Sequence, residues 1–236
     1  MSAIFKREFK AYFTSPLGYF VLALVFFFSG FFYYTYNMYA GSIDLSGVFG
    51  GLFTIVLLIV LPVLTMRLFS DEKRQKTDQA LLTAPVGLTG IAVGKFLAAL
   101  LVFALSISIT LIYAVMIAFS ATPDWMVIIG NYLGLLMLGG LIISIGLLIS
   151  SLTESQFVAA LGTFAVSFVL LMVDNLTSIF SSSTVVAAVV NFLSVSQRYN
   201  NFTAGVINYD DIVFFISMQA LFLFLTVRSL DRKRWS

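Results

Sequence analysis

The stretch Met66 to Gly87, MRLFSDEKRQKTDQALLTAPVG, concentrates charge in a chain that otherwise has little of it. Seven of the 24 Asp, Glu, Lys and Arg residues lie between Arg67 and Asp78. Of the 236 residues, 60% are hydrophobic and 10% are charged, whereas soluble domains average about 45–50% apolar and about 25% charged residues. The composition therefore predicts an integral membrane protein in which this stretch is a loop between spans.

Charge-free stretches on both sides of the loop predict transmembrane helices, because a span needs about 20 apolar residues. Six spans are expected, namely Leu17–Tyr39, Leu45–Met66, Phe96–Phe119, Trp125–Ser150, Phe157–Val173 and Ile212–Val227. The apolar run Thr184–Leu193 is too short to cross, so residues 175–211 are expected to form a re-entrant or interfacial helical segment. The fold class is thus an all-α membrane protein, one domain over residues 1–236.

The basic residues predict the orientation. With six spans, 12 of the 13 Lys and Arg residues fall on the side that holds both termini and the charged loop. Excess Lys and Arg mark the cytoplasmic side. The other side has one base, Arg198, and five aspartates. The N-terminus lacks a short apolar core followed by a cleavage site, so the first span is expected to stay in the mature, multi-pass protein.

Residues 1–14 have the pattern of an amphipathic helix. The aromatic side chains of one face are Phe5, Phe9, Tyr12 and Phe13, and the bases that face away from it are Lys6, Arg7 and Lys10. This arrangement predicts a helix on the inner leaflet, in contact with the lipid bilayer. The alternative is a frayed basic anchor. Pro16 then begins the first span.

Several kinds of site are disfavoured. The chain has no Cys or His, and no Asp, Glu, Lys or Arg lies centrally in a span, which argues against proton-driven transport but leaves a sodium site of carbonyls and hydroxyls open. No protease or hydrolase motif is present, and neither a catalytic residue, a metal site nor a nucleic-acid partner is expected. Residues 87–95 depart from a phosphate-binding loop at Thr89, and Phe96 follows, so any nucleotide must be bound by another chain.

Small residues in the fourth span predict close helix packing, since Gly140 with Ser144 and Gly146 with Ser150 are spaced four apart. The alternative is a face that slides against a second copy during transport. In the second span, Pro62 is expected to kink the helix as it enters the charged loop.

The charged loop itself favours a helix. Acidic and basic residues are mixed from Asp71 to Lys76, and an apolar patch with Leu81 and Leu82 follows before Pro85. This predicts a short amphipathic helix. The alternative is a solvated turn that only enforces topology, but topology needs positive charge alone, and this loop also holds three acids.

The segment RLFSDEKRQKTDQALLTAPV, with Gly94 and Lys95 following, resembles the segment after the second span in permease subunits of the type-2 ABC exporter family. It departs from the family pattern at Lys76, where Gly is usual, and at Asp78 and Gln79. The resemblance implies a coupling helix that sits in a cleft of a separate ATP-binding subunit. The residues expected to couple to that subunit are Arg67, Asp71, Glu72, Lys73, Arg74, Thr77, Leu81, Leu82 and Pro85.

Two further segments extend the resemblance. Residues 150–164 look like the short cytoplasmic turn between spans four and five. Residues 191–235 are similar to the C-terminal region of gliding-motility-type permease subunits, with Arg198 and Tyr199 in matching positions. The resemblance implies a half-size permease in the cytoplasmic (inner or plasma) membrane of a prokaryote. Its partners would be the ATP-binding subunit and either a second copy or a paralogous membrane subunit with an extracytoplasmic domain.

The resemblance thus implies a non-enzymatic permease subunit that couples ATP hydrolysis to export, with the ATP and Mg bound by the partner subunit. The alternative is a non-transporting scaffold that recruits an ATPase to power an extracytoplasmic machine. Arg198 and Tyr199 are candidates for an extracytoplasmic gate or partner contact, and the alternative for Arg198 is a structural ion pair with Asp210 or Asp211.

Overall fold

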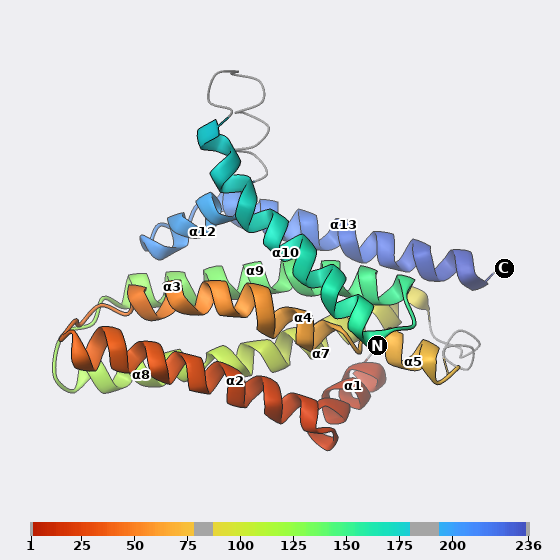
Figure 1. Ribbon diagram of the computed structural model, residues 1–236, viewed down its shortest axis with the longest axis horizontal. Coiled ribbons are helices and arrows are strands. Elements are labelled where there is room, and N and C mark those ends of the chain that lie inside the picture. The colour runs from red at the N-terminus through yellow and green to blue at the C-terminus, as the bar shows by residue number, and fades with distance from the viewer. Residues whose placement is uncertain (1, 78–86, 180–193, 235–236) are drawn as a thin grey trace.

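A computed structural model describes residues 2–77, 87–179 and 194–234, and every regular element in these ranges is a helix (Figure 1). The elements are α1 Ser2–Thr14, α2 Pro16–Tyr33, the π-helix η1 Tyr34–Tyr39, α3 Ser46–Ile55, the π-helix η2 Val56–Val60, α4 Leu61–Thr65, α5 Ser70–Arg74, α7 Leu88–Ile107, α8 Ile109–Ala118, α9 Trp125–Leu152, α10 Gln156–Ile179, α12 Val195–Thr203 and α13 Tyr209–Arg234.

Within the described ranges, five helical stretches are long and apolar enough to cross a membrane. They are Pro16–Tyr39, Ser46–Arg74, Leu88–Ala118, Trp125–Leu152 and Tyr209–Arg232. These correspond to the expected spans one to four and six. The expected fifth span falls on α10, whose apolar part, Gln156–Met172, is shorter. The all-helical, multi-span prediction is confirmed at this level.

The centre of the bundle is α9, which packs against α4, α7, α10, α12 and α13. Asp124 caps its start by accepting hydrogen bonds from the backbone N–H groups of Met126 and Val127. Gly146 lets α4 approach closely, because a Cβ there would lie 2.4 Å from Thr65 Oγ1. The packing role predicted for the small residues is confirmed. Gly140 and Ser144 are buried within the chain, so a face that slides against a second copy is the wrong interpretation.

The second span is irregular where Pro62 predicts it. The π-helix η2 separates α3 from α4, and Pro62 lies in the first turn of α4. Proline supplies no N–H to the helical ladder, and wider π turns commonly accompany such interruptions. Residues 66–69 then form a turn that leads into α5. The span therefore enters the charged loop through three short helical pieces.

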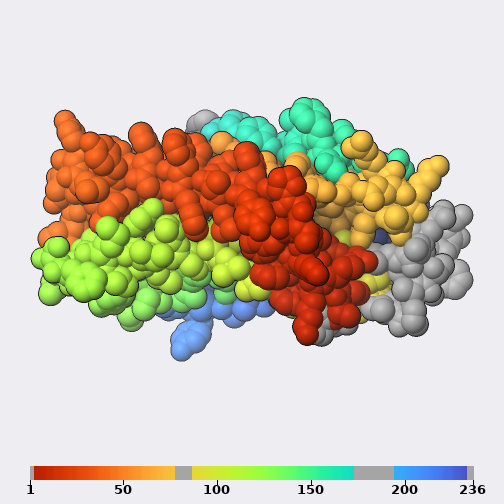
Figure 2. All heavy atoms as spheres, turned by 90° about the horizontal axis from the view of Figure 1, so that it is seen from below, coloured from red at the N-terminus to blue at the C-terminus, as the bar shows by residue number. Residues whose placement is uncertain are grey.

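The two ends of the bundle differ. The α5 end holds α5, the C-terminal end of α13 and, close by, α1, whereas the connections 40–45 and 119–124 lie at the opposite end (Figure 1). Figure 2 shows α1, in red, lying across the bundle toward the end where α5 lies, while α2 and α8 form the other end of that face.

The amphipathic character predicted for residues 1–14 is confirmed in α1. Lys6, Arg7 and Lys10 are exposed. Phe9 lies between Phe5 and Phe13 in a half-buried aromatic row, with ring centroids 6.2 and 5.1 Å apart. Tyr12 does not belong to that row, contrary to expectation. It is buried, and its hydroxyl donates to the Leu64 carbonyl at 3.0 Å.

At the opposite end, α12 packs beside the first turns of α9. Ser194 caps α12 by accepting from the Gln197 N–H at 3.1 Å. A Cβ at Gly130 would lie 2.5 Å from the carbonyl oxygen of Phe202, so glycine is what permits this contact. The expected short helix Thr184–Leu193 lies outside the described residues.

Candidate functional site

The first turn of α5 is fastened to the end of α9. Ser150 Oγ accepts hydrogen bonds from the backbone N–H groups of Phe69, at 2.9 Å, and Ser70, at 3.0 Å. The buried ammonium of Lys73 donates to the Ser151 carbonyl. A helix of five residues is not stable by itself, so the position of α5 depends on bonds to its neighbours, and these bonds attach it to α9.

The last turn of α5 ends in a Schellman motif. The Thr77 N–H donates to the Glu72 carbonyl at 2.9 Å and the Lys76 N–H to the Lys73 carbonyl at 3.0 Å. Lys76 has φ of 56°, a left-handed conformation that favours glycine. This explains why Gly is usual here in the resembling permeases. The helix expected to continue toward Leu82 therefore stops at Arg74, and Leu81, Leu82 and Pro85 lie outside the described residues.

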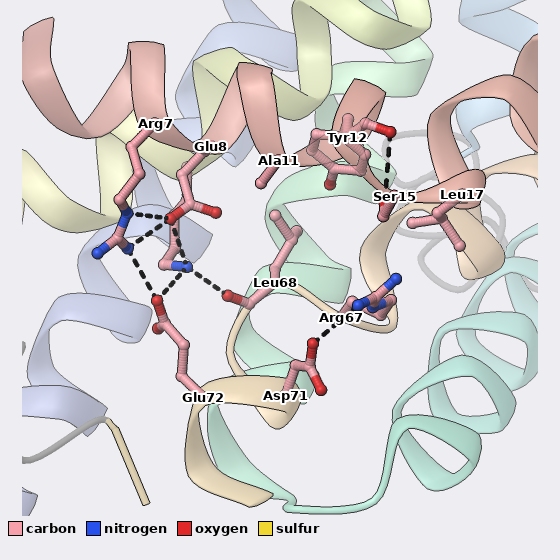
Figure 3. A pocket seen from close by; sticks show the side chains of 11 residues that line it. Arg7, Glu8, Ala11, Tyr12, Ser15, Leu17, Arg67, Leu68, Asp71 and Glu72 are labelled. Atoms are coloured by element: carbon pink, nitrogen blue, oxygen red, sulfur yellow. Dashed lines mark hydrogen bonds and ion pairs between the residues drawn. The ribbon is translucent and has the colours of Figure 1, made fainter. Parts of the chain in front are cut away.

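Behind α5 lies a cluster of four charged side chains, Arg7, Glu8, Glu72 and Lys95, here called the four-charge cluster (Figure 3). Lys95 Nζ lies 3.0 Å from Glu72 Oε1 and 3.2 Å from Glu8 Oε1. Arg7 Nη2 lies 2.9 Å from Glu72 Oε1 and 2.5 Å from Glu8 Oε1. Each base therefore bridges both carboxylates, which come from α1 and α5.

Lys95 is the most buried member of the four-charge cluster, with 1% of its side chain exposed. It also donates to the Leu68 carbonyl at 2.7 Å and lies 5.0 Å from the Phe69 ring centre. The neighbouring Gly94 brings α1 close, because a Cβ there would lie 3.1 Å from Ile4 Cγ2. In the sequence, Lys95 is one of the bases that mark the topology and belongs to the Gly94–Lys95 pair of the family pattern, but neither feature predicts that its ammonium lies between two carboxylates.

A pocket of about 270 Å³ opens between α1, the start of α2 and α5 (Figure 3). Its charged lining consists of the four-charge cluster together with Arg67 and Asp71. Arg67 Nη2 lies 3.0 Å from Asp71 Oδ2, and Gln156 donates to Asp71 Oδ1 at 2.8 Å. Burial, reinforced by the charge of Glu8, raises the pKa of Tyr12. Partial burial lowers the pKa of Arg7, but the carboxylates of Glu8 and Glu72 outweigh this and raise it.

The expected coupling residues divide into two groups. Asp71, Glu72 and Lys73 bond within the chain. Arg74 and Thr77 are exposed, as are Gln75 and Lys76 between them. Beside Arg74 lies an open hollow of about 610 Å³ between α5 and the α9–α10 turn, lined also by Glu154, Ser155 and Phe157. In the part of the loop that the structure describes, the outward surface therefore consists of residues 74–77 and this hollow.

At the opposite end, Arg198 is held within the chain. Arg198 Nη1 lies 2.9 Å from Asp211 Oδ1, and Asn201 donates to Asp211 Oδ2 at 2.8 Å. The guanidinium also lies 4.1 Å from the Phe214 ring centre. Asp210 is exposed, so Asp211 is the partner in the structural ion pair that the sequence allowed.

Tyr199 faces inward. Its ring stacks on Phe53 of α3 with centroids 4.5 Å apart, and 3% of the residue is exposed. Its hydroxyl has no hydrogen-bond partner in the part of the chain that the structure describes, and burial raises its pKa. Tyr199 thus presents no surface to a partner in this conformation. Among the described residues, no group of three or more Asp or Glu side chains could hold a metal ion.

Comparison with known proteins places this arrangement in a family. The family model described as ABC-2 family transporter protein matches residues 2–235. No curated protein matches the chain. The match runs through both the α5 region and the bundle of apolar helices that carries it. The chain therefore belongs to the ABC-2 family of transporter proteins.

Proposed function

We propose that the chain is the permease subunit of an ATP-driven exporter and that its ATP-binding partner docks on residues 74–77 and the adjoining hollow. One observation carries this proposal. The exposed polar surface of the charged loop is mounted on a helix that hydrogen bonds and ion pairs fasten to α7 and α9. A loop with only a topological role needs no such fastening.

The proposal includes the orientation. The α5 end is cytoplasmic because 12 of the 13 Lys and Arg residues belong to that side. The fifth span is supplied by α10, since its 24 residues extend about 36 Å at about 1.5 Å per residue, enough for a hydrocarbon core of about 30 Å. The half-buried aromatic row of α1 supports its placement on the inner leaflet.

The mechanism follows from the fastening of α5. Closure of two ATP-binding subunits displaces residues 74–77, and α5 passes the displacement to α9 through Ser150 and to α7 through Lys95. Arg67 and Pro62 pass it to the second span. ATP shifts the permease from one conformation to the other only if the docked partner binds the two conformations of the permease with different affinity. The permease halves are either two copies of this chain, or this chain and a paralogous membrane subunit with an extracytoplasmic domain. The resemblance to gliding-motility-type permease subunits supports the second arrangement.

The test is recovery of the ATP-binding subunit with the tagged permease from gently solubilised native membranes. We expect Arg74→Glu to lower that recovery at least tenfold, because it reverses an exposed charge at the docking surface. Arg228→Glu is the matched control, since Arg228 is an exposed base in the C-terminal part of α13, whose C-terminal end lies at the α5 end of the bundle. If no ATPase is recovered with the wild-type chain, the proposal fails. If an ATPase is recovered but reconstituted complexes move no cargo, the scaffold function replaces export.

A further inference from the structure

The outward side of α1 carries three exposed bases, and only one of them is bonded to α5. Lys6, Arg7 and Lys10 are exposed, and 53% of the Arg7 side chain is accessible. Arg7 Nη2 bridges Glu8 and Glu72. No ion pair of Lys6 or Lys10 is found among the described residues. Arg7 therefore stands between the surface of α1 and the helix that we assign to ATPase docking.

The surroundings of α1 identify what these bases meet. Phe5, Phe9 and Phe13 form a half-buried row with no polar group in it, which suits the acyl boundary of a membrane. Bases on an interfacial helix attract anionic headgroups near the membrane surface. The charge complementarity therefore points to a leaflet that contains anionic phospholipid.

A headgroup phosphate near Lys6 and Lys10 would compete with Glu8 and Glu72 for Arg7. Once Arg7 turns toward the phosphate, both carboxylates share Lys95 as their one remaining cation in the four-charge cluster, at 3.2 and 3.0 Å. Two like charges that share one counter-ion repel each other. Glu72 is weakly held on its other side too, since Glu72 Oε2 has no hydrogen-bond partner in the described structure.

We propose that anionic phospholipid headgroups bind the Lys6, Arg7 and Lys10 side of α1 and, by competing for Arg7, loosen α5 from α1. The part of this that concerns coupling rests on the proposed function of α5. Headgroup binding and the position of α5 are then linked, and the linkage is reciprocal, so that a partner which pulls α5 away from α1 also strengthens lipid binding.

The chain has no cysteine, so a single spin label reports on α5 without a background. Gln75→Cys places the label on an exposed residue at the end of α5. In phosphatidylcholine vesicles we expect an immobile label, and added phosphatidylglycerol is expected to raise the ratio of mobile to immobile label about fivefold, the low end of allosteric couplings. Inorganic phosphate added to phosphatidylcholine vesicles is expected to have no effect.

Two variants with opposite expectations test the pathway. Arg7→Gln removes the bridge, so the label is mobile without anionic lipid and does not respond to it. The pair Lys6→Gln and Lys10→Gln keeps the bridge and removes the attraction, so the label stays immobile with phosphatidylglycerol present. Arg228→Gln is the matched control and keeps the wild-type response. Headgroup competition is overturned if the wild type does not respond, if Arg7→Gln responds as the wild type does, or if inorganic phosphate reproduces the effect.

The lipid response is measured on the permease itself, so it is separate from recovery of the ATP-binding subunit. A wild-type response without any recovered ATPase supports the lipid linkage and refutes the proposed function of α5. Recovery of the ATPase without a lipid response supports the proposed function of α5 and refutes the lipid linkage.

Discussion

Replacing Lys95 with Met is the sharpest test of the four-charge cluster. The ammonium lies 3.0 Å from Glu72 and 3.2 Å from Glu8. At an effective dielectric constant of about 20, each pair is worth about 5 kcal/mol. Desolvating the ammonium offsets several kcal/mol of this sum. Met is unbranched and one heavy atom shorter than Lys, so it keeps most of the packing and the loss of charge dominates the change.

The expected cost is set by what remains after the substitution. Removing one partner of a buried ion pair costs about 3–5 kcal/mol, because the other charge is left uncompensated. Here Arg7 still contacts both carboxylates, and Glu8 and Glu72 keep 13% and 19% side-chain exposure. We therefore expect Lys95→Met to lower the free energy of unfolding by about 3 kcal/mol. Glu8→Gln in the same chain should restore about half of that loss, since it removes one of the two repelling carboxylates.

The assay is equilibrium unfolding in mixed micelles with increasing SDS, followed by far-ultraviolet circular dichroism. Lys10→Met is the control, because Lys10 is an exposed base on α1, the helix that carries Arg7 and Glu8, and we expect it to change the free energy by less than about 0.5 kcal/mol. If Lys95→Met costs under about 1 kcal/mol, or if Glu8→Gln makes it worse, then the cluster does not hold α1, α5 and α7 together as inferred.

Three further substitutions test local features. Lys76→Gly should relieve the left-handed strain by about 1 kcal/mol and slow hydrogen exchange of the α5 amides, whereas Lys76→Ala should not. Gly130→Ala should destabilise the protein by about 1–3 kcal/mol in SDS unfolding because it strikes a carbonyl of α12, while Gly50→Ala, with no atom within 4 Å, should be neutral. Tyr12→Phe should cost about 1 kcal/mol for its lost hydrogen bond and Tyr199→Phe almost nothing, measured the same way. In the folded protein, Tyr12 and Tyr199 stay protonated at a pH at which the unfolded chain, with the ordinary tyrosine pKa of 10.0, releases these protons. The free energy of unfolding should therefore fall as pH rises past that value. Each Phe variant should lessen the fall.

The spans could be predicted because a membrane-spanning helix needs a long run of residues without charge, and such runs are visible in the sequence. Five charge-free runs emerge as long apolar helices, and the irregularity near Pro62 follows from a missing N–H group. The end of α5 was not predictable in the same way. The charge pattern from Asp71 to Lys76 favours a longer helix. Lysine rarely adopts a left-handed backbone conformation, so the sequence does not predict the one found at Lys76. Only the glycine usual in related permeases hinted at it.

The four-charge cluster was beyond the sequence for a different reason. Lys95 and Arg74 count equally as bases on one side of the membrane, yet one is buried and the other exposed. The difference depends on which side of α1 packs against the bundle. The helix has two apolar edges, one with Ile4 and Tyr12 and one with the phenylalanine row, and the sequence does not distinguish them. Likewise, adjacent aspartates differ by about 100° around a helix, so only the rotation of α13 decides that Asp211 and not Asp210 meets Arg198.

The geometry separates two roles within one short loop. Charges that hold α5 in place, such as Glu72 and Lys73, face the bundle and are engaged within the chain, whereas Arg74 to Thr77 face outward. A loop that carried only partner contacts would leave its charges free, and a loop that served topology alone would need no acids. The inward set makes the outward set rigid, because five helical residues cannot support themselves. A force applied to residues 74–77 therefore arrives at α7 and α9 without first unfolding α5, which is what a coupling element requires.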